Sequence, residues 1–267
     1  MSTETTIQSF DGTRLFLKTD VPTAPKAIVV IVHGLCEHLG RYAYVTQKLT
    51  EHNLAVYRFD HRGHGRSEGQ PIFYNDFNEM IDDVNVVVEL AKQAHPALPL
   101  FLIGHSMGGL AVTTFGMKYP QQVNGIVASG AVTRFNNQFV VPPNMPVDAY
   151  FPNELAGGVC SDPAVVEAYV NDPLVAKQIS FGLFYSLFAA VAYNKQNSSK
   201  FVDPVLLLHG CHDGLVNEKD SRDLFGDIAS QDKSLKIYAF LLHEIFNEPS
   251  KDEVIGDVIA WIEKRIY

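Results

Sequence analysis

The sequence predicts an α/β fold with a mostly parallel central sheet and helices on both of its faces. Short apolar runs of strand length alternate along the chain with longer segments in which apolar residues recur at helical spacing. Some of the runs, such as Ala27–Val32, are apolar almost throughout, as parallel strands buried on both faces are. Alternation of this kind is typical of a sheet covered by helices on both sides. We therefore expect any ligand to bind outside the carboxyl ends of the strands.

The expected elements follow one another in this alternating order. A hairpin opens the chain, because Thr6–Phe10 and Arg14–Thr19 flank the pair Asp11-Gly12, which is a strong turn signal. The further strands that we expect are Ala27–Val32, Leu54–Phe59, Leu100–Ile103, Gly125–Ser129, Val205–Leu208 and Leu235–Tyr238. The expected helices are Tyr42–Glu51, Phe77–Gln93, Met107–Lys118, Glu218–Ile228 and Asp252–Arg265.

One stretch of the chain, residues 131–200, breaks the alternation. It contains the proline-rich run Val141–Pro146, the pair Phe151-Pro152 and several short apolar segments. A structureless loop of this length inside a compact domain is implausible. We therefore expect residues 131–200 to form a helical cap that is inserted into a core made of residues 1–130 and 201–267.

Length and composition agree with one enzyme-sized domain. The chain has 267 residues, of which 46% are hydrophobic and 19% are charged, and its net charge is −9. The negative charge excludes nucleic acid as an expected partner and disfavours electrostatic attachment to anionic lipid. The longest apolar run, Phe181–Tyr193, is shorter than the ~20 residues that span a bilayer, so no transmembrane segment is expected. The scattered cations Arg58, Arg62 and Arg66 are expected to form local ion pairs around a loop.

The cysteines indicate the compartment. Cys36, Cys160 and Cys211 are odd in number and lack the spacing of a zinc site, so neither a disulfide framework nor a bound zinc ion is expected. The segment Met1–Thr6 has no basic region followed by an apolar core, so it does not look like a secretory signal. Together these features favour a cytoplasmic location.

The motif Gly104-His105-Ser106-Met107-Gly108 is the strongest chemical signal in the chain. An apolar strand precedes it and a helical segment follows it, which is the context of a nucleophile elbow. Such a turn exposes the serine hydroxyl and is crowded, which is why it needs glycines. A serine hydroxyl is a weak nucleophile that requires a base and donors for the oxyanion it creates. We therefore expect Ser106 to be a nucleophile and the Met107 backbone N–H to be one oxyanion donor.

A nucleophile elbow predicts its partners in the chain order serine, acid, histidine. Asp213 comes directly after one of the later strands, and His243 lies between the last strand and the last helix. We expect Asp213 to be the acid and His243 to be the general base. Asp203 lies at the wrong end of its strand and Asp220 falls within the next helix, so neither is the expected acid.

Other loops at the same edge carry the remaining candidates. The backbone N–H of Leu35, in the loop after Ala27–Val32, is the expected second oxyanion donor. Several further histidines also follow predicted strands and are expected to hydrogen-bond a loop or to line a pocket: His33, His61, His64, His209 and His212. The group His33, His61 and His64 lacks the paired spacing of a metal site, so no metal is expected.

Several motifs together resemble the α/β-hydrolase fold and, within it, the monoacylglycerol lipase and lysophospholipase family. The most specific are Asp60–Gly69, which reads D-H-R-G-H-G-R-S-E-G, and His243–Glu248, which reads H-E-I-F-N-E. The remaining segments extend the resemblance over nearly the whole chain and are His33–His38, Arg41-Tyr42, Gly104–Gly109, Ser161–Val166, Asn171–Val175 and His209-Gly210 with Asp213 and Val216.

The resemblance implies hydrolysis of carboxylic esters, typically monoacylglycerols or lysophospholipids, without a cofactor. Ser106, Asp213 and His243 match the family's catalytic triad, and Leu35 and Met107 match its oxyanion positions. It therefore implies a small acyl ester as the partner of this chain.

Two departures from the family pattern bear on substrate preference rather than on the reaction. Cys36 stands where relatives often have glycine, and Leu241-Leu242 precede the histidine where a polar or aromatic residue is commoner. The loop Asp60–Gly65 is expected to brace the nucleophile region by hydrogen bonds. We therefore expect the reaction class of the family, with a head-group and chain-length preference that the motifs leave open.

The apolar segment Phe181–Tyr193 has two interpretations. One is a helix buried between the cap and the core, and the other is a wall for an acyl chain or a surface that contacts lipid transiently. The two overlap, because a cap helix can pack inward and still line a pocket. The candidate substrate-binding residues on this segment are Phe181, Phe184, Leu187 and Phe188.

Two other classes of function stay open at this point. One is a different hydrolase on the same fold, either a small-ester carboxylesterase with short-acyl preference or a cofactor-free haloperoxidase. Epoxide and haloalkane hydrolases are disfavoured because they use an aspartate nucleophile where this chain has Ser106. The other class is a non-catalytic binding module, which is disfavoured because such proteins usually lose a member of the triad.

A covalent serine reagent separates an activated serine from an inert one. We expect a fluorophosphonate probe to label the wild-type protein on Ser106 and to leave Ser106→Ala unlabelled, because only a serine paired with a base reacts quickly. Mass spectrometry of the labelled peptide is the measurement. Labelling of Ser106→Ala to the wild-type extent, or no labelling of the wild type, would contradict the assignment.

Overall fold

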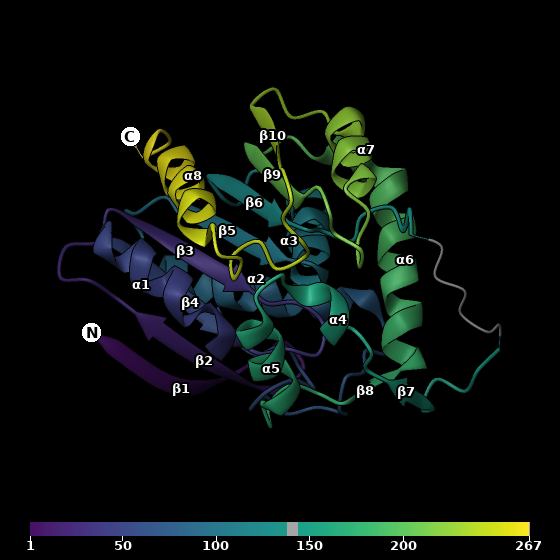
Figure 1. Cartoon of the computed structure of the whole chain (residues 1–267). Helices are drawn as coiled ribbons and strands as arrows, with labels where there is room; N and C mark the ends of the chain where they lie inside the picture. Colours follow the sequence, from purple (N-terminus) through teal and green to yellow (C-terminus); the bar gives the residue numbers. More distant parts are fainter. Residues whose placement is uncertain (138–143, 267) are drawn as a thin grey trace.

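The computed structural model describes residues 1–137 and 144–266. Its central sheet has eight strands in the order β1-β2-β4-β3-β5-β6-β9-β10 (Figure 1). In chain order these strands are β1 (Ser2–Gln8), β2 (Arg14–Asp20), β3 (Ala27–Val32), β4 (Leu54–Phe59), β5 (Leu100–His105), β6 (Gly125–Ser129), β9 (Val205–Gly210) and β10 (Lys233–Tyr238). β1 and β2 form an antiparallel hairpin, β2 also pairs antiparallel with β4, and the remaining strands run parallel. The predicted, mostly parallel sheet is confirmed.

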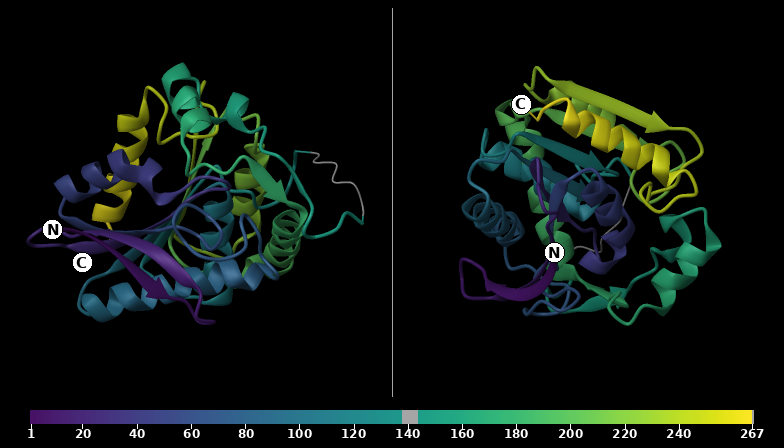
Figure 2. Two further views of the ribbon diagram at one scale, coloured as in Figure 1. Left: turned by 90° about the horizontal axis from the view of Figure 1, so that it is seen from below. Right: turned by 90° about the vertical axis from the view of Figure 1, so that its left-hand side faces the viewer.

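Helices cover both faces of the sheet (Figure 2). On one face lie α1 (Ala43–Glu51), which follows the 3₁₀ turn η1 (Leu39–Tyr42), and α8 (Lys251–Glu263). On the other face lie α2 (Phe77–Ala94), α3 (Met107–Lys118) and α7 (Lys219–Asp227). Each of these helices agrees with a predicted one to within two residues at either end.

Strand β3 shows why the parallel strands are apolar along their whole length. Its alternate residues Ile28, Val30 and Val32 belong to the core beneath α2 and α3. The intervening residues belong to the second core, beneath α1 and α8. Because successive side chains of a strand point to opposite faces, a strand with two buried faces favours apolar residues at nearly every position.

The first strand differs from the sequence-based prediction. β1 begins at Ser2 and ends at Gln8, whereas the expected strand was Thr6–Phe10. Its seven residues pair continuously with β2, from Ser2 opposite Asp20 to Gln8 opposite Arg14. β1 is an exposed edge strand rich in threonine and serine, so it lacks the apolar alternation on which the prediction relied. The predicted turn is present, with Gly12 at φ +88°.

Between β6 and β9 the chain leaves the sheet and builds a separate set of elements over its carboxyl edge (Figures 1 and 2). They are β7 (Tyr150–Pro152), α4 (Ala156–Val159), α5 (Pro163–Asn171), β8 (Gln178–Ser180), α6 (Phe181–Asn197) and the 3₁₀ turn η2 (Ser198–Lys200). β7 and β8 pair antiparallel. Residues 141–143 of the predicted proline-rich run lie outside the described residues. We propose that residues 131–200 form the cap, as these elements suggest.

Helix α6 contains the apolar segment for which two interpretations were open. It packs along α3 and α2, and Leu183 and Ala190 on it are fully buried. The buried Asn194 side chain donates to the hydroxyls of Thr113 and Thr114 on α3, at 3.2 and 3.4 Å. Its interpretation as a helix buried against the core is confirmed. No helix among residues 1–137 and 144–266 is both long and apolar enough to cross a membrane.

A buried ion pair joins the hairpin, the loop after β4 and helix α2. The fully buried Asp83 carboxylate accepts from Arg62 Nε at 2.7 Å and Nη2 at 2.8 Å, and from the Ser9 hydroxyl. Arg62 also reaches Asp11 at 2.8 Å. Burial raises the pKa of Asp83, and the hydrogen bonds and charge of Arg62 oppose that rise. Arg62 therefore forms the expected local ion pairs. Arg58 and Arg66 also form ion pairs, with Asp20 and Glu4.

We expect Asp83→Ala to lower the free energy of unfolding by about 3 kcal/mol, because it removes the buried carboxylate that accepts two hydrogen bonds from the Arg62 guanidinium. Urea denaturation is the measurement. Glu89→Ala on the same helix is the control, since its pair with Lys92 is exposed and should contribute less than about 1 kcal/mol. The double variant Arg62→Met/Asp83→Leu should recover much of the loss. Equal effects for Asp83→Ala and Glu89→Ala would contradict the prediction.

Candidate active site

Ser106 lies at the sharp turn between β5 and α3, where the predicted elbow places it. Its backbone has φ 54° and ψ −116°, a strained conformation for a residue with a side chain. A Cβ atom at Gly108 would lie 2.0 Å from the carbonyl oxygen of Val32, and one at Gly104 would lie 2.2 Å from that of Gly108. These glycines are therefore required because strand, turn and helix approach too closely for any side chain.

The predicted acid and base are in direct contact. His243 Nδ1 and Asp213 Oδ2 are 2.7 Å apart, and both side chains are buried. The other carboxylate oxygen of Asp213 accepts the backbone N–H groups of Leu215 and Val216, each at 2.9 Å. These bonds hold the carboxylate in place, and with Nδ1 protonated toward it, His243 keeps Nε2 as the basic nitrogen.

The ionisation of the pair follows from this contact. Burial opposes the charge on His243, but the charge and hydrogen bond of Asp213 outweigh it and raise the pKa of His243 above its ordinary value of 6.5. Burial likewise opposes ionisation of Asp213, but His243 and His209 hold the pKa of Asp213 well below its ordinary range. Asp213 is therefore ionised at neutral pH and stabilises an imidazolium.

His209 supports the acid, a role that the sequence did not single out. Its Nε2 lies 3.0 Å from Asp213 Oδ2 and 3.0 Å from the carbonyl oxygen of Val216, and its Nδ1 lies 2.8 Å from the hydroxyl of Ser221. The sequence reasoning assigned it only a general structural role. Its place at the end of the strand that precedes the acid was the available signal.

The expected oxyanion donors flank Ser106. A Cβ at Gly34 would lie 3.2 Å from Ser106 Cβ, so the loop that carries Leu35 touches the serine. The Glu37 carboxylate holds this loop by accepting the Gly34 N–H at 2.6 Å. Within the described part of the chain, the N–H groups of Leu35 and Met107 donate to no protein acceptor. The oxyanion role expected for both groups requires N–H groups that are free in this way.

An ion-pair network joins the Leu35 loop to the His243 loop. Arg41 donates to Glu37 at 3.0 Å and to both carboxylate oxygens of Glu244, one of them at 2.8 Å. Its guanidinium also lies 4.9 Å from the centre of the Tyr169 ring in the cap. Burial raises the pKa of Glu244, and Arg41 opposes that rise. Arg41 and Glu244 were noted only as parts of family motifs, because their pairing spans 203 positions.

Cys36 is the family departure in the same loop. It is fully buried and has φ 65°, the left-handed conformation in which glycine is commonest. Burial raises the pKa of its thiol, so it stays protonated. Its carbonyl oxygen accepts the Ala176 N–H at 2.9 Å, which ties this loop to the cap.

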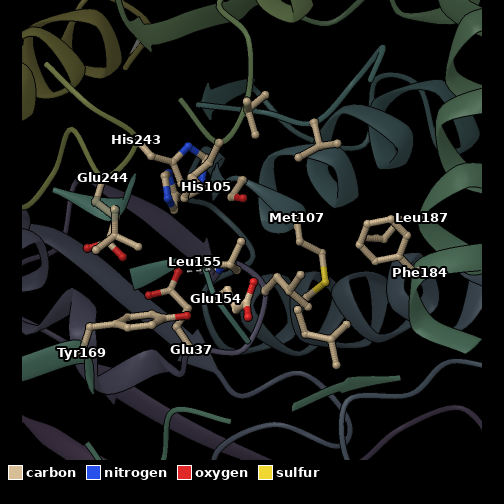
Figure 3. Close-up of a pocket in the computed structure, with 18 of the residues that line it drawn as sticks. Glu37, His105, Met107, Glu154, Leu155, Tyr169, Phe184, Leu187, His243 and Glu244 are labelled. Atoms are coloured by element: carbon tan, nitrogen blue, oxygen red, sulfur yellow. Dashed lines mark hydrogen bonds between the residues drawn. The ribbon is translucent and has the colours of Figure 1, made fainter. Parts of the chain in front are cut away.

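Ser106 and His243 open into one cavity of about 350 Å³ between core and cap (Figure 3). Its polar lining includes Glu37, Glu154, Glu244 and Tyr169. Figure 3 shows Glu37, Glu244 and Tyr169 on the side of the cavity away from Phe184 and Leu187. The rest of the wall is apolar and includes Val132, Phe135, Phe151, Phe184, Leu187, Leu215 and Val216. The cavity can therefore hold a molecule with one hydroxyl-bearing end and one hydrocarbon end.

The four substrate-binding candidates on α6 take two positions. Phe184 and Leu187 line the cavity. Phe181 packs on Phe151 with ring centres 5.0 Å apart, and Phe188 packs on Phe135 at 4.6 Å. These two rings stand behind residues of the wall and support them.

The histidines of the loops after β3 and β4 form a separate buried cluster. The rings of His33 and His61 lie 4.6 Å apart, and His64 is 5.4 Å from His33. Burial lowers the pKa of His33 and of His64 to about 3, so both are neutral. His33 accepts the His61 N–H at 2.9 Å, which braces the loop as expected. Within the described ranges, no group of three His, Cys, Asp or Glu side chains could hold a metal ion.

The fold and the site define a serine hydrolase of the α/β-hydrolase class. Residues 23–250 match the family described as "Serine aminopeptidase, S33", and the chain belongs to that family. It is 35% identical to the monoacylglycerol lipase of Mycolicibacterium smegmatis, over 96% of this chain and 95% of that one. It is 32% identical to human monoglyceride lipase, over 96% of this chain and 88% of that one. The crystal structure of Paleococcus ferrophilus monoacylglycerol lipase superposes with a TM-score of 0.82 at 28% identity, covering 94% of this chain and 99% of that one.

The reactivity of Ser106 should depend on pH through His243. The base works only when neutral, so the rate of inactivation by a fluorophosphonate should fall as pH decreases through the His243 pKa, with a midpoint above 6.5. Asp213→Asn should move that midpoint to lower pH and slow inactivation by about 10²–10⁴-fold. Glu89→Gln, far from the site, is the matched control. A midpoint below 6.5 in the wild type would contradict the prediction.

Proposed function

We propose that this protein hydrolyses carboxylic esters of the monoacylglycerol or lysophospholipid type, with Ser106, Asp213 and His243 as its catalytic triad. The observation that carries the proposal is the cavity, which Ser106 and His243 line together with acidic side chains and an apolar wall. In an ester of a long acid with a polyol, the carbonyl likewise lies between a hydroxyl-bearing part and a hydrocarbon part. The family membership and the similarity to monoacylglycerol lipases support the same substrate class.

The proposed reaction has two halves. His243 Nε2 takes the proton of the Ser106 hydroxyl as its oxygen attacks the ester carbonyl, and the N–H groups of Leu35 and Met107 stabilise the resulting oxyanion. His243 then gives the proton to the departing alcohol, which leaves an acyl ester on Ser106. Water, deprotonated by His243, repeats the attack and releases the acid. Asp213 keeps the imidazole oriented and stabilises its charged form in both halves.

Between the two head-group classes, the charges of the cavity favour a neutral glyceryl group. Glu37, Glu154 and Glu244 line the cavity, and Arg41 is the cation that pairs with two of them. Carboxylates accept hydrogen bonds from hydroxyl groups but repel a phosphate. We therefore place monoacylglycerols ahead of lysophospholipids as substrates.

The hydrocarbon part of the substrate would lie along α6 and the segment that follows β6. Phe184 and Leu187 form that wall together with Phe135 and Val132. We also propose that the cap contacts a lipid surface transiently, from which such a substrate would enter; its exposed apolar residues include Val147 and Val170. A short-acyl carboxylesterase remains the second candidate, because closely packed phenylalanine rings limit the length of the wall.

An ester panel tests the proposal. We expect the wild type to hydrolyse monoacylglycerols and p-nitrophenyl esters with a rate that rises with acyl length, because each buried methylene adds about 0.8 kcal/mol of transfer free energy. Ser106→Ala should lose all turnover. Release of glycerol and of p-nitrophenol from substrates of acetyl to palmitoyl length is the measurement, with lysophosphatidylcholine as the head-group comparison.

The outcomes of the panel are distinct. Turnover restricted to acetyl and butyryl esters would replace the proposal by the short-acyl carboxylesterase. Lysophosphatidylcholine hydrolysed faster than monoacylglycerol would overturn the head-group preference. Absence of Ser106-dependent turnover on every ester would refute ester hydrolysis itself.

A further inference from the structure

The segment 130–136, between β6 and the cap, connects the acid–base pair to the apolar wall. A Cβ at Gly130 would lie 3.1 Å from His243 Nδ1, so the segment begins against the base. Next, the Val132 N–H donates to the Ser106 carbonyl oxygen at 3.4 Å. Val132 and Phe135 then line the cavity. The path of this one segment therefore determines where the wall stands relative to the nucleophile.

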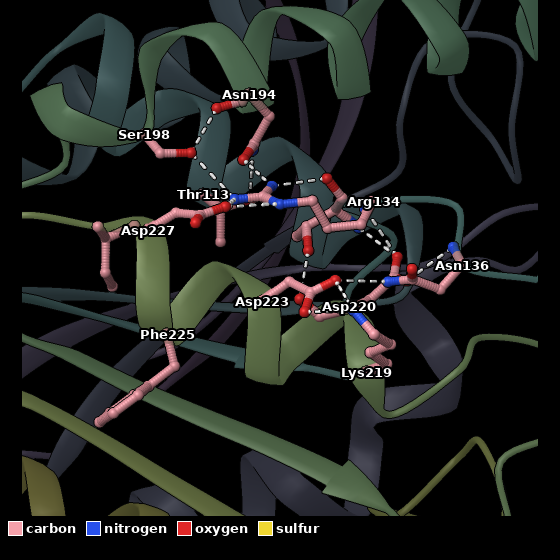
Figure 4. A network of polar contacts seen from close by, with 12 residues as sticks. Thr113, Arg134, Asn136, Asn194, Ser198, Lys219, Asp220, Asp223, Phe225 and Asp227 are labelled. Carbon is pink, nitrogen blue, oxygen red and sulfur yellow. Dashed lines mark hydrogen bonds and ion pairs between the residues drawn. The ribbon is translucent and has the colours of Figure 1, made fainter.

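A single buried carboxylate holds the segment. Asp220, on α7, is fully buried, and its Oδ2 accepts the backbone N–H groups of Thr133, Arg134 and Phe135 at 2.9, 2.8 and 3.1 Å (Figure 4). Its Oδ1 accepts the backbone N–H of Asn136 at 3.0 Å and the side-chain amide of Asn136 at 2.9 Å. Four consecutive backbone donors thus converge on one side chain. Such convergence fixes the backbone dihedral angles of the whole segment.

The hydrogen bonds to Asp220 hold the backbone of Phe135 in a strained conformation. Phe135 has φ 52°, which costs a residue with a side chain about 1–2 kcal/mol. Its ring lies 4.6 Å from that of Phe188 and 6.4 Å from that of Phe184, both on α6. Hydrogen bonds to Asp220 offset the cost, so the position of this ring depends on the carboxylate.

Arg134 ties the same segment to α6 and α7. Its guanidinium donates to Asp227 at 2.8 Å, to the Asn194 side chain at 3.0 Å and to the Ser198 hydroxyl at 3.0 Å (Figure 4). Its main chain is held by Asp220, and its side chain by the end of α6. The segment and the α6 helix, which together form the apolar wall, are therefore attached to one buried polar network.

We propose that Asp220 is a positioning residue that sets the acyl-length preference of the enzyme by holding Phe135 in the cavity wall. This inference rests on the proposed ester hydrolysis and adds what determines its selectivity. Asp220 touches neither Ser106 nor His243, so it acts on substrate choice through the ring it positions. A purely structural residue would change the rate on all esters alike, whereas Asp220 changes the ratio between long and short ones.

Two substitutions separate the ring from the carboxylate that holds it. Phe135→Ala removes the ring and should raise the ratio of kcat/KM for palmitoyl over octanoyl monoacylglycerol by about tenfold or more, because the wall recedes. Asp220→Asn places an NH₂ group against backbone donors, releases the ring and should shift the ratio in the same direction by about fivefold. Glu218→Gln is the matched control, since this carboxylate flanks the same helix and pairs with Arg222 instead.

The double variant Asp220→Asn/Phe135→Ala decides whether the carboxylate acts through the ring. We expect it to have the acyl-length ratio of Phe135→Ala alone, because Asp220 has no ring left to position. An Asp220→Asn ratio equal to that of Glu218→Gln, or additive effects in the double variant, would overturn the inference. A wild type that hydrolyses no ester would instead refute the proposed function.

Hydrogen exchange on the wild-type protein tests the carboxylate even if Asp220→Asn does not fold. The N–H groups of residues 133–136 donate to a side chain in an irregular segment, and we expect protection on the order of 10²-fold or more over an unstructured peptide. The measurement is exchange followed by mass spectrometry, with residues 144–149 of the cap as the internal comparison. Exchange of residues 133–136 as fast as an unstructured peptide would overturn the inference.

Discussion

The close approach of α3 to the sheet at Gly108 is the constraint on which the site depends. The Val32 carbonyl of β3 occupies the space where a side chain at this position would be, so β3, β5 and α3 meet without intervening atoms. That contact allows the chain to turn sharply at Ser106 and brings the loop after β3 against the serine. The proposed nucleophile and both proposed oxyanion donors are therefore placed by one backbone contact in the middle of a parallel sheet.

Buried charges do the remaining positioning, and each joins loops that are distant in the sequence. Arg41 links the loop after β3 to the loop of His243, and Asp220 holds the segment that leaves β6. His209 and His243 share the carboxylate of Asp213. A buried charge is costly unless its hydrogen bonds are complete, so each of these groups specifies a single arrangement of its loops. Hydrogen-bonded polar groups therefore hold the proposed active site together, in addition to apolar packing.

Much of the fold could be predicted because its signals are local. Strands β3, β4 and β6 and helix α3 match their predicted bounds, since apolar runs and helical periodicity reflect burial directly. The order of Ser106, Asp213 and His243 along the chain also sufficed to pair the acid with the base. The first strand was misplaced because an exposed edge strand has no apolar pattern.

Other features were beyond sequence reasoning because they depend on contacts across the fold. Asp220 was set aside as a helix residue, and the five hydrogen bonds that its carboxylate accepts from residues 133–136 join positions more than eighty apart. The four α6 candidates form one apolar stripe in the sequence, yet packing places Phe184 and Leu187 at the cavity and Phe181 and Phe188 behind it.

By itself the sequence determined the fold class, the elbow and the residues proposed for the reaction, because these follow from periodicity and from motifs of adjacent residues. Only the tertiary structure decided the shape and polarity of the cavity and the groups that hold its walls. The physical reason is that a cavity is the space left between elements, and its form depends on how their side chains pack against one another.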